Sequence, residues 1–456
     1  MTEDGAAPVA AAAVAEVEVV VLAAVQADIT ARLAARTDMA LGGGDRAWLR
    51  ELVDEHLQRY HGTAPLHGRP VLPRAAYRAL GQRIFARVTP LGPLGELLAD
   101  PTVEEIIVNG PAEVLVVRDG VQVPAGVEFA SEDELIDLVQ QQLARSATHL
   151  DRANPMVTAT LEDGSRLNAV LPPVAQPLAI TIRKHQLARF TTLQDLVDAG
   201  AMPPELAALL RAVVQARLNV VVSGGTGSGK TTLLRVLIGE VAADERIITI
   251  EDQRELHVRT AHAGRRNTIS LEARDANVEG RGEIAIQQLV RNALRQRPDR
   301  IFVGECRGPE ALDVIDAMGT GHDGSGTTLH ANSLRDALHR LGTLVRRHPT
   351  QSRADPGAIG REVAAKVDCL VHLARIRDGA GREWRVVHAL GLVTGAVEGD
   401  TPVVDEVCRY EPATGGWRWA LTRFDDLPPK VGEKLQGVRR DLDALTAALQ
   451  LRRLEG

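Results

Sequence analysis

The residues with the clearest capacity for chemistry form a glycine-rich loop at positions 224–231, which matches the pattern G-x-x-x-x-G-K-S/T without a gap. Glycines at this spacing let the backbone curl until its N–H groups point inward at phosphate oxygens, and the N-terminus of a following helix adds positive potential. The loop therefore predicts a binding site for the phosphates of a nucleotide. Its residues are Gly224, Gly225, Thr226, Gly227, Ser228, Gly229, Lys230 and Thr231.

Two side chains at the end of this loop carry its specific chemistry. Lys230 is expected to bridge the β and γ phosphates of ATP, and Thr231 is expected to hold Mg²⁺ through its hydroxyl. A chance match is the alternative. However, the loop lies between an apolar stretch at 219–222 and a helical stretch at 231–238, the strand–loop–helix order that phosphate binding needs.

Carboxylates end two further apolar stretches. Residues 301–304 form an expected strand that leads into Glu305, a position from which Mg²⁺ or its water is held. Residues 247–250 lead in the same way into Glu251. Because sites in parallel sheets form at the C-terminal ends of strands, we expect both acids to face the same crevice as Lys230. Glu251 is the candidate base that orients or deprotonates the attacking water, and a solvated turn acid is the alternative.

A histidine follows the next expected strand. His330 lies in the segment 327–333, and a lone histidine in such a place is more often packed or solvated than catalytic. Ser333 and Asp336 have the spacing of a capping box, which predicts that a helix begins there. His330 would then lie at a strand-to-helix junction on the same edge as the other motifs. The functional interpretation of His330 is that it senses the γ-phosphate of the nucleotide.

The elements that must position these residues follow from periodicity and turn signals. Alternating strands and helices over 216–376 predict an α/β domain with a mostly parallel sheet covered on both faces. A length of 456 residues indicates two or three domains. The expected regions are an N-terminal helical region at 1–87, a mixed α+β domain at 88–190, a linker helix at 191–215, the ATPase domain at 216–395 and a C-terminal extension at 396–456. Further elements expected are helices at 13–36, 45–60, 131–146, 283–295 and 430–452, and strands at 103–108, 114–117, 157–160, 178–183, 366–376 and 384–394.

Bulk properties exclude several classes of protein. A formal net charge of −7 argues against a chain built to coat nucleic acid, so direct nucleic-acid binding is not expected. The three cysteines are far apart and give neither a disulfide framework nor a paired CxxC zinc site, which predicts a reducing cytoplasm. The Ala- and Val-rich segment 6–24 contains acidic residues and has no basic residue before it, so we expect neither a signal peptide nor an intrinsic transmembrane segment.

Together these motifs resemble one family, the secretion and type IV pilus ATPases of the type II/IV secretion (traffic) ATPase superfamily. In that family a P-loop, an acidic Asp box, a Walker B strand ending in Gly-Glu and a His box occur in this order. The matching segments here are 224–231, 249–256, 301–307 and 321–333. Segments 163–168 and 180–184 resemble signatures of the family's N-terminal domain, and the resemblance covers about residues 88–376.

The resemblance implies a RecA-like P-loop NTPase domain preceded by a smaller, PAS-like α+β domain. It also implies a homo-hexameric ring with ATP at or near subunit interfaces, docked on inner-membrane platform proteins at the cytoplasmic face of the membrane. Arg166 and Arg183 match arginines that reach a neighbouring subunit's phosphates, and Arg291 and Arg295 are secondary candidates. A surface role is the alternative for each arginine.

Within the superfamily, the segment 304–308 resembles the branch that powers tight-adherence (Tad or Flp) pili, because Gly308 stands where other branches typically place Asp. Gly319 and Gly326 depart from that branch's usual residues. The four-cysteine zinc element of type II secretion ATPases is absent. Three rival functions stay open: a conjugation or type IV secretion ATPase, a DNA-dependent RecA-like motor, and a non-catalytic assembly scaffold.

Overall fold

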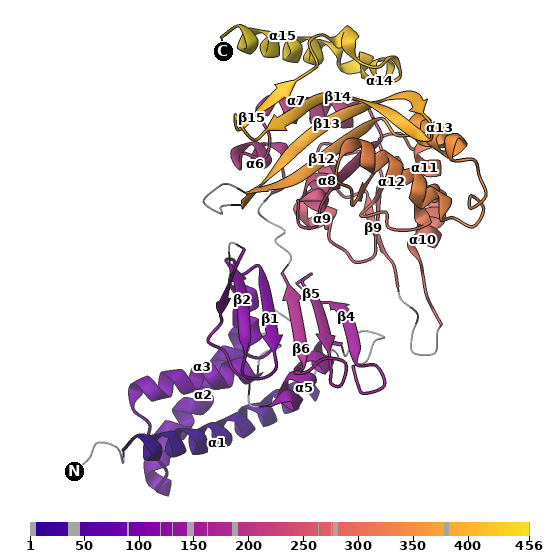
Figure 1. Cartoon of the computed structure of the whole chain (residues 1–456). Helices are drawn as coiled ribbons and strands as arrows, with labels where there is room; N and C mark the ends of the chain where they lie inside the picture. Colours follow the sequence, from indigo (N-terminus) through magenta and orange to yellow (C-terminus); the bar gives the residue numbers. More distant parts are fainter. Residues whose placement is uncertain are drawn as a thin grey trace. The chain divides into compact units, whose positions relative to one another are not determined.

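Two compact units, Met1–His185 and Gln186–Gly456, make up the chain in this computed structural model (Figure 1). The structure describes residues 6–455 except 35–45, 89–90, 119, 130, 144–149, 162, 185–189, 263, 275, 277–280 and 378–382. Each unit is described by itself below.

Helices form the first part of the first unit and share one hydrophobic core. Val21, Leu52 and Ile84, from three different helices, are each almost fully buried in it. The expected helices at 13–36 and 45–60 are confirmed with shifted ends, whereas the third helix was not predicted. The elements are α1 (Ala6–Ala34), α2 (Arg46–Thr63), a 3₁₀ turn (Ala64–His67) and α3 (Arg74–Val88).

A six-stranded antiparallel sheet forms the rest of the first unit, in the order β3-β2-β1-β6-β5-β4. Strand β1 alternates in burial, and its buried residues Ile106 and Val108 share a core with Leu135 of helix α5. This is the period of two expected of a half-buried strand. The elements are α4 (Leu94–Ala99), β1 (Glu105–Asn109), β2 (Val114–Arg118), β3 (Val121–Pro124), α5 (Glu132–Leu143), β4 (Met156–Thr160), β5 (Arg166–Val170) and β6 (Ala179–Arg183).

A nine-stranded sheet organises the second unit, in the order β15-β14-β13-β12-β7-β11-β10-β8-β9. The six strands from β12 to β9 pair in parallel, and β13, β14 and β15 continue the sheet with antiparallel pairing. The strands are β7 (Val220–Gly224), β8 (Ile247–Glu251), β9 (Thr268–Glu272), β10 (Arg300–Val303), β11 (Gly326–Leu329), β12 (Cys369–Arg377), β13 (Glu383–Glu398), β14 (Thr401–Glu411) and β15 (Gly416–Trp419).

Helices cover both faces of this sheet, as the alternating pattern predicts. On β7, Val220 and Val222 belong to one hydrophobic core and Val221 to the other, because successive side chains of a strand point to opposite faces. The helices are α6 (Leu193–Asp198), α7 (Pro204–Gln215), α8 (Lys230–Gly239), α9 (Val258–Ala261), α10 (Ile286–Ala293), α11 (Glu310–Gly319), α12 (Leu334–Arg346), α13 (Pro356–Lys366), α14 (Pro429–Leu435) and α15 (Arg439–Glu455).

The C-terminal part of the chain packs into the second unit. Strand β13 runs through the expected boundary at residue 395, and Leu442 and Leu449 of α15 share a core with α7. The prediction of a single helix over 430–452 is wrong, because a 3₁₀ turn at Gln436–Val438 separates α14 from α15. The domain boundaries expected at 87, 190, 215 and 395 stay predictions.

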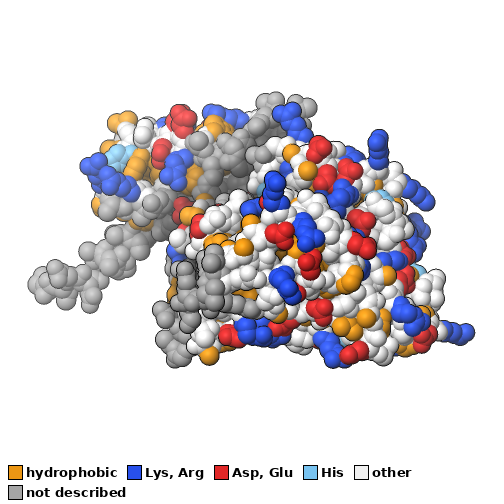
Figure 2. Space-filling model, turned by 90° about the horizontal axis from the view of Figure 1, so that it is seen from above, with side chains coloured by type: hydrophobic (Ala, Val, Ile, Leu, Met, Phe, Trp, Pro, Cys, Tyr) orange, Lys and Arg blue, Asp and Glu red, His pale blue; other side chains and the backbone are white. Residues whose placement is uncertain are grey.

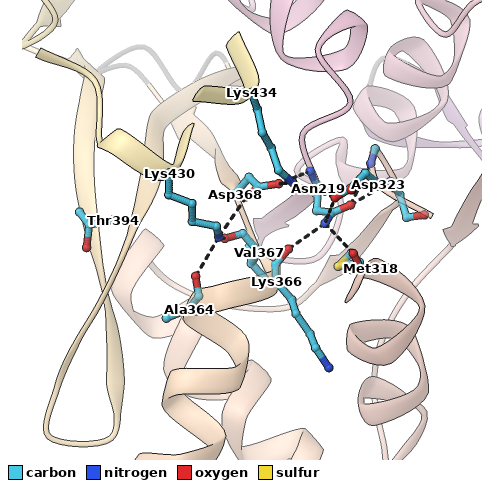
Figure 3. Close-up of polar contacts among 12 residues, drawn as sticks. Asn219, Met318, Asp323, Ala364, Lys366, Val367, Asp368, Thr394, Lys430 and Lys434 are labelled. Carbon is cyan, nitrogen blue, oxygen red and sulfur yellow. Dashed lines mark hydrogen bonds and ion pairs between the residues drawn. The ribbon is translucent and has the colours of Figure 1, made fainter. Parts of the chain in front are cut away.

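A buried ionic cluster fastens α14 to the sheet (Figure 3). Asp368 is fully buried just before β12, with its carboxylate 3.0 Å from Nζ of Lys430 and 2.8 Å from Nζ of Lys434. The backbone N–H of Asn219 donates to the same carboxylate at 2.9 Å. A carboxylate removed from water needs such partners, since burying it alone would cost several kcal/mol.

The side chain of Asn219 extends this cluster to three neighbouring segments. Its amide donates to the carbonyls of Met318 and Lys366, and its oxygen accepts the N–H groups of Gly324 and Ser325 (Figure 3). The start of the P-loop strand is therefore tied to the end of α11, the end of α13 and the turn before β11.

We expect Asp368→Ala to lower the free energy of unfolding of the second unit by about 3–5 kcal/mol, because it removes the buried carboxylate that two partly buried lysines share and leaves the N–H of Asn219 without its acceptor. Urea unfolding followed by tryptophan fluorescence measures the change, since three of the four tryptophans (Trp384, Trp417 and Trp419) lie in the second unit. Asp425→Ala is the matched control, since Asp425 is 75% exposed in its ion pair with Arg439 and its loss should cost less than about 1 kcal/mol. Equal effects of the two variants would contradict the role given to Asp368.

Candidate active site

The glycine loop joins a buried strand to a helix, as the sequence predicts. Strand β7 ends at Gly224 and helix α8 begins at Lys230. Gly224, Gly227 and Gly229 have positive φ angles of 152°, 69° and 98°, which residues with a Cβ rarely adopt. At Gly224 a Cβ would also lie 2.5 Å from the carbonyl oxygen of Leu373. The loop conformation therefore depends on glycine at these positions.

Lys230 lies inside the loop and is only 8% exposed. Its ammonium donates to the carbonyl of Gly225 at 2.9 Å and lies 3.4 Å from Nδ1 of His330. The hydroxyl of Ser228 donates to the same carbonyl at 2.9 Å. Burial lowers the pKa of Lys230, although the charge of Glu305 opposes this. The result is a partly desolvated cation at the point where phosphates are expected.

Glu305 and His330 lie together beside this lysine. Nε2 of His330 is 3.0 Å from one carboxylate oxygen of Glu305, and Arg307 donates to the other at 2.6 Å. Burial, followed by the charge of Lys230, lowers the pKa of His330. A neutral ring can accept at Nδ1 from Lys230, whereas the approach of Nε2 to Glu305 lacks the geometry of a hydrogen bond. The expectation that these side chains share one edge of the sheet is confirmed.

Glu251 ends strand β8 and is only 3% exposed. One of its carboxylate oxygens accepts the N–H groups of Glu255 and Leu256, at 3.0 and 2.9 Å. The other is buried and has no hydrogen-bond partner among the residues that the structure describes. Desolvation raises the pKa of Glu251 to about 7, against the two hydrogen bonds that lower it. A carboxyl that titrates near neutral pH suits a general base.

The residue before Glu305 makes room for Glu251. A Cβ at Gly304 would lie 2.9 Å from Cγ of Glu251, so the acid of the neighbouring strand needs glycine at this position, directly after β10. The two acids are brought together because β8 and β10 pair in parallel, with Val303 opposite Ile250.

Sequence reasoning missed two charged side chains at this site. The negative charge of Glu255 acts on both Lys230 and Arg307, so Glu255 belongs to the same electrostatic environment. It is the third carboxylate of the segment 249–256, and that acidic clustering was the available signal. Arg385 of β13 donates to the carbonyl of Gly227 at 2.8 Å. No local pattern marks it, because it lies 158 residues from its partner.

The candidate arginines have different surroundings. Arg166 and Arg183 lie on β5 and β6 of the first unit, exposed and directly opposite each other. Like charges in this position repel, which favours an anion between them. Arg291 pairs with Asp313 at 2.7 Å and thereby links α10 to α11, and Arg295 is exposed in the 3₁₀ turn after α10. The roles of Arg166 and Arg183 at phosphates stay a prediction.

The oxygens available near the loop suit Mg²⁺ bound together with a nucleotide. Among the described residues, no group of three or more His, Cys, Asp or Glu side chains could hold a metal ion alone. Mg²⁺ with a nucleotide needs only one or two protein oxygens, since phosphates and water supply the rest. The hydroxyl of Thr231, in the first turn of α8, and the carboxylate of Glu305 are oxygens of this kind.

Within the described part of the chain, no helix is both long enough and apolar enough to cross a membrane.

Comparisons with known proteins agree with the motifs. The family profile described as Type II/IV secretion system protein matches residues 88–386. A protein named for conjugal transfer in Mycobacterium tuberculosis is 40% identical over 302 residues, which cover 65% of this chain and 83% of that protein. The type IV secretion system protein VirB11 of Brucella suis is 33% identical over 318 residues, which cover 64% of this chain and 87% of that protein.

Two solved structures also match this chain, with TM-scores below 0.5. The VirB11 ATPase of the Brucella suis type IV secretion system is 30% identical and has a TM-score of 0.35, with 69% of this chain and 96% of that chain covered. The Legionella pneumophila ATPase DotB is 17% identical and has a TM-score of 0.48, with 79% and 90% covered.

The mixed α/β fold of the second unit, with its loop between β7 and α8, fits a RecA-like domain. The predicted fold class is therefore confirmed. The profile match spans more than half of this chain. The chain therefore belongs to the family of type II/IV secretion system proteins, the secretion ATPase superfamily that its motifs predicted.

Proposed function

We propose that this chain is an ATP-hydrolysing motor of a conjugation or type IV secretion machine. The observation that carries the proposal is the chain of contacts from Lys230 through His330 to Glu305 at the mouth of the glycine loop. The conjugal transfer and type IV secretion names of the relatives support the class of machine.

The reaction is an in-line attack of water on the γ-phosphate that yields ADP and phosphate. Lys230 exchanges the carbonyl of Gly225 for the β and γ oxygens, and the loop N–H groups neutralise growing charge. Glu251 orients the water and accepts its proton. Mg²⁺, held by Thr231 and Glu305 when the nucleotide is bound, supplies further charge stabilisation.

His330 suits the role of sensor because it contacts two charged groups expected to act on the nucleotide. It lies 3.4 Å from Lys230 and 3.0 Å from Glu305, so a change in the partners of either one alters its contacts. Through the capped start of α12 at Ser333, this change reaches a helix of the core.

The working assembly proposed is a homo-hexamer at the cytoplasmic face of the membrane, held there by platform proteins. Arg166 and Arg183 would reach the phosphates of a neighbouring subunit. Their opposed, exposed guanidinium groups on β5 and β6 support binding of an anion.

A Tad or Flp pilus motor is the second candidate, favoured by Gly308 in the Walker B segment. A Cβ at Gly308 would lie 2.8 Å from a carboxylate oxygen of Glu310, the flexible end of that side chain. Glu310 also accepts the N–H groups of Arg307 and Gly308. We rank the conjugation class first because the relatives are named for conjugal transfer and type IV secretion. Adjacent relaxase genes would support conjugation, and adjacent prepilin genes would support a pilus.

Two other functions are less well supported. A DNA-dependent motor predicts ATPase stimulation by DNA, but the net charge is −7, and acidic and basic side chains are interspersed on the face drawn in Figure 2. A non-catalytic scaffold predicts that Lys230→Ala would preserve the function of the machine. The buried ammonium and its carboxylate neighbours favour catalysis instead.

Glu251→Gln and Glu305→Gln should each leave ATP affinity within a few-fold of the wild type and reduce turnover by on the order of 10² or more. Both variants keep Lys230 and the loop N–H groups that bind the phosphates, whereas each loses a charge that stabilises the transition state. Nucleotide titration and steady-state phosphate release measure the two quantities. Glu398→Gln, at an exposed carboxylate paired with Arg335, is the matched control. Near-normal turnover of both site variants would refute these assignments.

The raised pKa of Glu251 gives a pH dependence of definite sign. Between about 4.5 and about 7 the folded chain holds a proton that the unfolded chain has lost, so this carboxyl's contribution to stability falls as pH rises through that window. If Glu251 is the base, kcat/KM should rise through the same pH range. Thermal unfolding and initial rates from pH 5 to 8 test both trends, and Glu251→Gln should flatten the stability trend. An unchanged trend in that variant would assign it to another group.

Arg166→Ala should impair hydrolysis more than nucleotide binding if the guanidinium acts on a neighbour's phosphate. Mixing this variant with Lys230→Ala should then restore activity, because an intact P-loop in one subunit meets an intact arginine from the other. Each variant alone serves as the inactive control. Failure of every mixing ratio to exceed the sum of the separate activities would count against action between subunits.

A further inference from the structure

The strands beside the P-loop bring two arginines against it from the side opposite His330. Strand β7 lies between β11, which precedes His330, and β12. Arg375 of β12 and Arg385 of β13 are direct neighbours in the register of these two strands. Both belong to a part of the chain to which neither the motifs nor the reaction described above assigns a role.

Arg385 holds one peptide group of the loop. Its Nε donates to the carbonyl oxygen of Gly227 at 2.8 Å. In a planar trans peptide the carbonyl and the following N–H point in opposite directions. When Arg385 holds this carbonyl on the outer side of the loop, the N–H of Ser228 must point to the inner side.

The N–H of Ser228 does point inward in the structure. It lies 3.4 Å from the carbonyl of Gly225, a long hydrogen bond to the same acceptor that Lys230 uses. A phosphate oxygen is a stronger acceptor than this carbonyl, because it carries negative charge. The donor that Arg385 orients is therefore available to a ligand.

The two arginines also lie close enough to the loop for their charge to matter. A Cβ at Gly229 would lie 3.8 Å from Cδ of Arg385, and one at Gly227 would lie 3.8 Å from Nη1 of Arg375. Arg375 pairs with Glu383 at 3.2 Å, and Arg377 pairs with the same carboxylate at 3.2 Å. One carboxylate thus faces two of the hairpin's guanidinium groups, while Arg385 is directed to the loop.

We propose that Arg385 is a positioning residue of the nucleotide site, which holds the Gly227–Ser228 peptide so that its N–H faces the phosphates. This inference rests on the proposed ATP-binding function. Because loop amides contact the β-phosphate that ATP and ADP share, loss of Arg385 should weaken both nucleotides alike. Turnover at saturating ATP should fall less than affinity does, because the N–H of Ser228 binds the phosphates before as well as during the reaction.

The test is isothermal titration of ADP and of a slowly hydrolysed ATP analogue into the full-length chain. Arg385→Ala should weaken both nucleotides by about tenfold, in line with loss of one charge-assisted hydrogen bond. Arg385→Lys, which keeps the charge and one donor, should recover part of the affinity. Arg377→Ala is the matched control, since Arg377 is an exposed arginine of the same hairpin whose ion pair is with Glu383.

Thermal unfolding shows whether Arg385 positions the loop for the nucleotide or only stabilises the fold. The nucleotide-free Arg385→Ala variant should melt close to the wild type, while its gain in melting temperature on addition of ADP should shrink. Wild-type affinity in Arg385→Ala would overturn the inference alone. Equal destabilisation of the Ala and Lys variants without nucleotide would show that Arg385 only stabilises the fold, and this result would also overturn the inference. Failure of the wild-type chain to bind ADP would overturn the proposed function and the inference with it.

Discussion

The parallel pairing of strand β7 with both of its neighbours is the constraint on which the site depends. Ser223, the residue before the loop, lies opposite Leu329 of β11 and opposite His372 of β12. His330 is the next residue after that pairing, so the register itself brings it to the loop. A shift of one residue in either pair would turn these side chains to the other face of the sheet. The glycines at 224, 227 and 229 then permit the turn that leads into α8.

The same register explains which parts of the site could be predicted from sequence. The loop, Glu305 and His330 each follow a short apolar strand, and parallel strands end at a common edge. Their types and order were therefore enough to predict that they meet. Glu255 and Arg385 could not be found in this way. Glu255 lies in an irregular segment, and Arg385 reaches the loop only because β13 pairs with β12.

The fold was predictable to a similar depth. Alternating strands and helices predicted the parallel part of the sheet and its two covered faces. The antiparallel strands β14 and β15 were not expected, because their sequences mix polar residues such as the exposed Asp405 with apolar ones and show little apolar alternation. The pairing of Asp368 with Lys430 and Lys434 joins positions more than 60 residues apart, and no local pattern reports such a contact.

Occupation of the loop must rearrange several contacts at once. In the structure, Lys230 and Ser228 share the carbonyl of Gly225, while Glu305 lies between His330 and Arg307. A γ-phosphate attracts Lys230 and competes with Glu305 for cations, so the histidine between them loses or changes one partner. Because Lys230 and Glu305 are largely buried, the loss of a partner is costly for each, and the site favours two distinct arrangements over a continuous range. This is the property that the proposed motor function needs, and it arises here from charged groups that share their partners.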